Sequence, residues 1–130
     1  MTTFALAGLL STSLALLASG PQQADRIPVA IRLVGDDGLT QRLLSGIEDD
    51  LRVNPKLRLA NADDRNTIAI ESDSNVGWDE LSGRTVVIYT VYVYRGENRG
   101  APKTGICYES DIPKCAKAIT RLARIRAEWP

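Results

Sequence analysis

The feature that most constrains the fold is an unbroken run of β-branched residues and tyrosines from Thr85 to Tyr94, TVVIYTVYVY. Residues of these kinds favour extended backbone, so the run predicts a strand. Side chains of a strand alternate between its two faces. One face carries Val87, Tyr89, Val91 and Val93, and the other carries Val86, Ile88, Thr90, Tyr92 and Tyr94. Because both faces can bury apolar surface, we expect this strand inside a sheet and not at its edge.

The remaining elements follow from hydrophobic spacing and from turn residues. Strands are predicted over 29–34, 56–60, 67–71 and 104–108, with 56–60 and 67–71 forming a hairpin and 104–108 forming a second hairpin with the long strand. A helix is predicted from Leu39, with Asp36 or Asp37 at its start and Asn54-Pro55 at its end, and another after Ser110 or Asp111. Residues 72–84 are expected to be a polar loop.

This order, β-α-β-β-β-β-α, predicts a single small α+β domain. Its sheet of four to five strands is antiparallel or mixed, and two helices pack on one face of it. The other face stays partly open, with Tyr92 and Tyr94 on it, or Tyr89 if the register is reversed. The order of elements resembles that of small α/β domains in envelope assembly proteins such as the amino-terminal domain of TolB. No motif residue is shared, so the resemblance concerns topology alone and implies no function.

The amino terminus is expected to be an export signal. Phe4 to Leu17 reads FALAGLLSTSLALL, which suits the apolar core of a signal peptide and is short for a bilayer span of about twenty residues. A polar, proline-containing stretch separates it from the domain. We therefore divide the chain into a signal peptide over 1–24, with an uncertain cleavage site, and a single domain over 25–130. No stable membrane span is expected after cleavage, and the location is periplasmic or secreted. An uncleaved anchor is the alternative.

Composition excludes several kinds of chemistry. The chain has no histidine and two cysteines, so serine-histidine and cysteine-histidine nucleophiles and zinc sites that need imidazole are closed to it. No metal site, cofactor or catalytic residue is predicted. Sixteen basic and sixteen acidic residues give a formal charge of zero, which favours neither nucleic acid nor anionic lipid as a partner.

The two cysteines are expected to form a disulfide. Cys107 ends the last strand and Cys115 lies in the first turn of the last helix. A strand-to-helix corner can bring their Cα atoms to the separation that a disulfide needs. In an exported chain a bonded pair is favoured over free thiols or a redox-active pair, which usually has C-x-x-C spacing.

The acidic residues give no clear site. Glu71, Asp73 and Asn75 alternate like the first ligands of a calcium loop, but Val76 stands where glycine is needed and Ser82 where a bidentate glutamate is needed. A solvated loop is favoured there. Asp36-Asp37 and Asp63-Asp64 are interpreted as a helix cap and a turn, and not as an acid/base pair.

Candidate interaction residues are basic or aromatic. Lys114, Lys117, Arg121 and Arg124 recur at helical spacing and form a basic stripe, which could bind an acidic partner or could be an ordinary solvated face. Trp78 is either a docking anchor or a flap over the core. The sequence thus predicts a non-enzymatic protein-interaction module of the cell envelope or extracellular space, which binds another envelope or extracellular protein. The alternatives are an inhibitor or immunity-type protein of a periplasmic hydrolase, which requires a protruding loop at 72–84 or 95–103, and a small carboxylate-based hydrolase.

Overall fold

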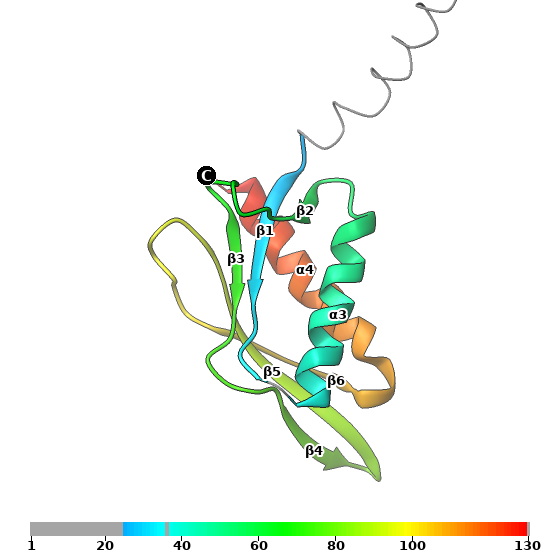
Figure 1. Ribbon diagram of the computed structural model, residues 1–130. Helices are drawn as coiled ribbons and strands as arrows, with labels where there is room; N and C mark the ends of the chain where they lie inside the picture. The colour runs from blue at the N-terminus through cyan, green and yellow to red at the C-terminus, as the bar shows by residue number, and fades with distance from the viewer. Residues whose placement is uncertain (1–24, 36, 130) are drawn as a thin grey trace, which may run out of the picture.

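A computed structural model describes residues 25–35 and 37–129, so the predicted signal peptide lies outside the described residues. The elements follow in the order β1 (Ile27–Arg32), α3 (Gly38–Val53), β2 (Leu57–Leu59), β3 (Ile68–Glu71), β4 (Gly77–Leu81), β5 (Arg84–Arg95), β6 (Lys103–Tyr108), a 3₁₀ turn (Glu109–Asp111) and α4 (Ile112–Glu128) (Figure 1). None of the described helices has the length and apolar character needed to cross a membrane.

The strands form one curled, mixed sheet of six strands, which confirms the predicted α+β class with one strand more than expected. The long strand β5 is its centre, as its sequence predicts. Its residues 84–88 pair antiparallel with β4, residues 86–91 with β6 and residues 92–95 with β3. The expected hairpin between the long strand and 104–108 is therefore present as β5 and β6.

The expected hairpin between 56–60 and 67–71 is wrong. β2 and β3 do not pair with each other, because β1 lies between them and pairs in parallel with both. Val29 of β1 is fully buried, with Leu59 beside it on one strand and Ile68 on the other. A hairpin of β2 and β3 would leave one edge of this apolar strand unpaired.

The expected polar loop over 72–84 contains a strand, β4. Its five residues are exposed, so no buried alternation marks them as a strand in the sequence. The strand is held by backbone pairing with β5 and by a two-residue turn, in which Ser82 and Gly83 both have positive φ, 53° and 76°. Such a turn matches the twist of a hairpin. In the sequence, the Ser82-Gly83 pair is the pattern that indicates this turn.

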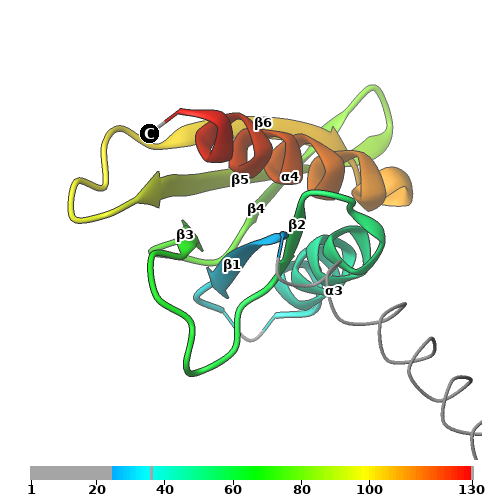
Figure 2. The same ribbon diagram turned by 90° about the horizontal axis from the view of Figure 1, so that it is seen from above.

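Both helices pack on one face of the sheet and against each other, as predicted (Figures 1 and 2). Asp37 caps α3 by accepting a hydrogen bond from the Thr40 backbone N–H at 3.4 Å, and Asn54 ends it. The helices approach closely where a side chain on Gly46 would meet the Ala116 methyl at 3.1 Å. The core between them and the sheet is apolar, and its fully buried members include Leu43, Ile47, Leu51, Ile70, Val87 and Ile119.

Candidate functional site

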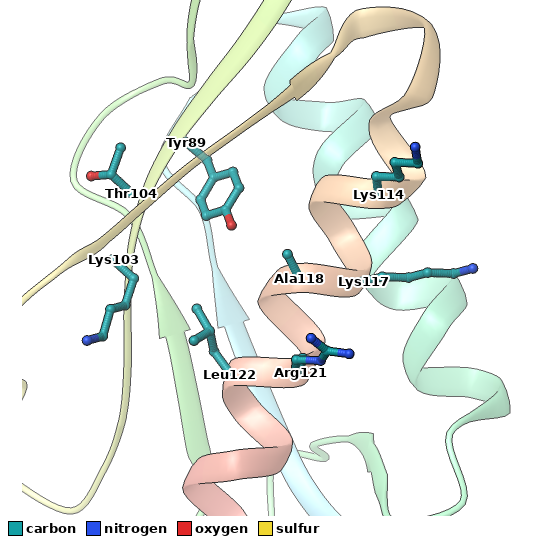
Figure 3. A pocket seen from close by; sticks show the side chains of 8 residues that line it. All are labelled: Tyr89, Lys103, Thr104, Lys114, Lys117, Ala118, Arg121 and Leu122. Carbon is teal, nitrogen blue, oxygen red and sulfur yellow. The ribbon is translucent and has the colours of Figure 1, made fainter.

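A cleft of about 580 Å³ opens between β6 and α4 (Figure 3). We call it the basic cleft. It is lined by Tyr89, Lys103, Thr104, Lys114, Lys117, Ala118, Arg121 and Leu122. Half of these residues are cations and none is a carboxylate. A hollow with one sign of charge concentrates opposite charge near it, so the cleft is suited to an anionic group.

The two walls of the cleft come from different parts of the sequence. Lys103 and Thr104 begin β6, whereas Lys114, Lys117 and Arg121 lie on one face of α4 at helical spacing. Figure 3 shows Lys103 on one side and the three α4 cations on the other, with the amino groups of Lys103 and Lys117 extending in opposite directions, so the charged ends do not meet at one point. This arrangement is better matched to an extended anion than to a small ion.

The floor of the cleft depends on a glycine. Tyr89 of β5 pairs with Gly105 of β6, and its ring lies where a side chain on Gly105 would be, with ring atom Cε2 only 2.5 Å from an ideal Cβ. The ring is 6% exposed and its hydroxyl points toward α4 (Figure 3). Burial raises the pKa of Tyr89, so the hydroxyl is neutral at physiological pH and can donate or accept a hydrogen bond in the cleft.

A disulfide ties the two walls together. Cys107 of β6 is bonded to Cys115 of α4, with their Cα atoms 5.7 Å apart. This confirms the predicted bond. Because the bond joins the strand to the first turn of the helix, it limits how far the walls of the cleft can separate.

Most of the cleft's charge is not neutralised. Lys114 lies 3.3 Å from the carboxylate of Asp111. In the described part of the chain, none of Lys103, Lys117 and Arg121 takes part in an ion pair. These charges are available to a partner.

The structure brings only part of the predicted interaction set together. Lys114, Lys117 and Arg121 line the basic cleft, while Arg124 is exposed on α4 outside it. Trp78 does not line the cleft; it lies on β4 and is 63% exposed. Lys103 and Thr104 were not predicted as interaction residues, and Tyr89 was considered only as a residue of the open sheet face, whereas all three line the cleft. Lys103 could have been found from its place at the start of the strand that carries Cys107, because the predicted bond to Cys115 joins that strand to the helix with the basic stripe.

Tyr92 and Tyr94 lie on the sheet face opposite the helices, in a network centred on Glu71. Tyr94 donates a hydrogen bond to Glu71 at 2.9 Å, and Arg32 is paired with the same carboxylate. Arg99, from the loop between β5 and β6, stacks on Tyr92 at 3.6 Å from the ring centroid. These tyrosines are half-buried in this network and are not a bare aromatic patch.

Arg99 also contacts two carboxylates, those of Asp73 and Glu71. It donates to Asp73 at 2.6 Å and lies 3.5 Å from Glu71. Burial acts to raise the pKa of Glu71, but hydrogen bonds from Arg32 and Tyr94 and the charges of Arg32 and Arg99 outweigh it and lower the pKa. The Arg99 hydrogen bond likewise lowers the pKa of Asp73. Both are ionised at neutral pH, whereas a general acid must hold a proton.

The described residues contain no group of three or more histidine, cysteine or acidic side chains placed to hold a metal ion. The calcium-like segment is used differently: Glu71 and Asp73 are both engaged by Arg99. The oxygen atoms that a cation would need are thus already paired with a guanidinium.

Comparison with known proteins gives a shared fold. No protein family matches the sequence, and no curated protein does. Among solved structures, the chain is similar to a minor lipoprotein from Acinetobacter baumannii, with a TM-score of 0.51 and 17% sequence identity. The match covers 78% of this chain and 93% of that one. The two proteins have the same general fold, and at this identity the similarity extends no further.

Proposed function

We propose that this protein is an exported, non-enzymatic module of the cell envelope that binds an acidic segment of another protein in the basic cleft. The observation that carries the proposal is the composition of the cleft, in which four cations and no carboxylate line a hollow of about 580 Å³. A surface built only for solubility mixes both signs of charge.

The location rests on three independent features. The sequence predicts a signal peptide, the domain contains a disulfide of the kind that persists in oxidising compartments, and a protein of the same fold is a lipoprotein. Intact mass of the protein recovered from an exporting host tests this location. A mass without about the first two dozen residues, two hydrogens below the reduced form, supports it, and a full-length chain with free thiols contradicts it.

Binding is tested by titrating a fluorescent peptide rich in glutamate, at low and at physiological salt. Lys117→Glu reverses a charge on the cleft wall and is expected to weaken binding about tenfold. Arg124→Glu makes the same change on the same helix outside the cleft, so it is the matched control and is expected to change affinity less than about twofold. Equal effects of the two variants, or binding insensitive to salt, would contradict the proposal.

One observation favours an inhibitor of a periplasmic hydrolase as the second candidate. The hairpin of β4 and β5 projects beyond the helices (Figure 1), and it carries Trp78 and Leu81, which are 63% and 51% exposed. Inhibitors commonly insert a rigid projection into a cleft of the enzyme. Under this alternative, Trp78→Ala abolishes binding of the partner while Lys117→Glu leaves it unchanged.

A further inference from the structure

We propose that the acidic segment binds as an additional β-strand on the free edge of β6, and that it alternates acidic with apolar residues. This inference rests on the proposed function and specifies the chemistry of the partner. It follows from the unpaired edge of β6, the two hollows beside that edge, and the different character of its two faces.

Three strands of the sheet have a free edge, and β6 is the one suited to accept a strand. Natural edges are usually protected by shortness or by charged residues. β2 has three residues, and β4 carries the adjacent acids Asp79 and Glu80. β6 has six residues with Lys103 at one end, and it pairs only with β5. Every second residue of β6 therefore directs its backbone N–H and C=O groups away from the sheet.

Hollows lie beside both ends of β6. The basic cleft is lined by Lys103 and Thr104 at its start. A second hollow, of about 290 Å³, is lined by Ile106, Cys107 and Tyr108 at its end, together with Leu81, Val86, Asp111 and Lys114. Lys114 lines both hollows. Space for side chains is thus present beside both ends of the strand to which the partner would pair.

The two faces of the edge differ in chemistry. On the helix side, Gly105 has no side chain, and the Tyr89 ring that takes its place forms the floor of the cleft beside the α4 cations. On the opposite side Ile106 pairs with Ile88 and is 60% exposed. An added strand sends successive side chains to these two sides in turn. Those that face α4 meet positive charge. Those between them meet the exposed Ile106 at the middle of the strand, with Thr104 before it and Tyr108, over which Arg84 lies, after it.

The spacing of the charges fits this alternation. Side chains on one face of a strand repeat every ~6.6 to 6.8 Å. Lys117 and Arg121, four residues apart on α4, are separated by ~6 Å along the helix axis. Acidic residues at every second position of a strand can therefore each lie near a different cation of the helix.

A second copy of this chain fits the edge poorly. Of the longer free strands it would offer, β6 carries Lys103 and no acid, so it would not neutralise the cations of α4, and β4 carries the acids Asp79 and Glu80, which are adjacent in sequence. Adjacent residues point to opposite faces of a strand. One acid would face the cations, but the other would be placed against Ile106. We therefore assign the edge to a partner with alternating acidic and apolar residues.

The test compares peptides of one composition. An octapeptide that alternates glutamate and valine is expected to bind the full domain at least tenfold more tightly than a peptide with its glutamates in one block and its valines in another. Two N-methylated versions of the alternating peptide are also made, one for each set of alternate amides. One register is expected to abolish binding and the other to leave it nearly unchanged, because only every second N–H of an added strand faces β6.

The outcomes separate this inference from the proposed function. If both orders bind equally, both N-methylated registers bind, and Lys117→Glu still weakens binding, then the cleft binds acidic segments without strand addition and the inference is overturned. If no acidic peptide binds, the proposed function fails as well.

A change in the protein gives a second test. Ile106→Lys is expected to weaken the alternating peptide about tenfold and to leave the block peptide unaffected. Val53→Lys is the control, since Val53 is 79% exposed at the far end of α3. Light scattering with each variant tests whether a second copy of this chain occupies the edge instead. A dimer of the native protein that Ile106→Lys dissociates would assign the edge to a second copy and overturn the inference.

Discussion

Replacing Gly105 with alanine tests the packing on which the basic cleft is built. An ideal Cβ at this position lies 2.5 Å from Cε2 of Tyr89 and closer still to Cζ and the hydroxyl oxygen. Real Cβ atoms do not approach other atoms this closely, so the ring must leave its place. The ring is buried against Gly105 across a paired position of β5 and β6, so it cannot move without disturbing the packing there.

The expected loss can be bounded from both sides. Overpacking a core costs about 1 to 3 kcal/mol of unfolding free energy. Returning a ring that buries about 150 Å² to water costs up to about 4 kcal/mol, at about 25 cal/mol per Å². Alanine recovers about 0.5 to 1 kcal/mol, because glycine is unfavourable within a strand. We expect Gly105→Ala to reduce the free energy of unfolding by about 2 to 3 kcal/mol, measured by urea denaturation.

Gly77→Ala is the matched control. Gly77 also lies in a strand paired with β5, but the atoms nearest to its ideal Cβ are 3.7 and 3.9 Å away. This variant should be neutral or slightly stabilising. A second control places Gly105→Ala in a Tyr89→Val background, where no ring occupies the site and the alanine should cost little. Equal midpoints for Gly105→Ala and Gly77→Ala, or an undiminished cost in the Tyr89→Val background, would refute the reasoning.

Three other perturbations have defined outcomes. Glu71→Gln should lower the free energy of unfolding by about 1 kcal/mol at pH 7. Because the pKa of Glu71 is lowered in the folded state, this difference is present above about pH 4.5 and disappears as the pH falls through the pKa of the folded state. Urea titrations at several pH values measure it. Cys107→Ser with Cys115→Ser should cost about 2.5 kcal/mol by urea denaturation and should also weaken binding of acidic peptides, since the cleft walls are no longer joined. Arg26→Ala should cost about 1 kcal/mol in the same assay, because this guanidinium hydrogen-bonds the Leu51 carbonyl at 2.8 Å near the end of α3. For each variant, a urea midpoint equal to that of the native protein would contradict the reason given.

Local patterns predicted the elements better than their pairing. The β-branched run of β5, the cap at Asp37 and the stop at Asn54-Pro55 each act through nearby residues, so the sequence displays them directly. The position of β1 between β2 and β3 depends on contacts far apart in the chain. A short polar connection between two strands was interpreted as a hairpin turn, although in this fold it carries the chain across β1.

The site was predictable in part for the same reason. Lys114, Lys117 and Arg121 share a helix face, and helical periodicity places them together. Lys103 joins them only through the packing of β6 beside α4, which no local pattern encodes. β4 was missed because all its side chains are exposed, so the backbone pairing that defines it leaves no apolar trace in the sequence.

The place of β1 in the sheet has a consequence for how the chain matures. β1 is the first strand to be synthesised, yet both of its neighbours, β2 and β3, come later, and the second is complete only at Glu71. Until then its apolar residues have no sheet to enter, since a strand in the middle of a parallel group cannot form alone. The part of the sheet around β1 therefore cannot close until Glu71 has been synthesised.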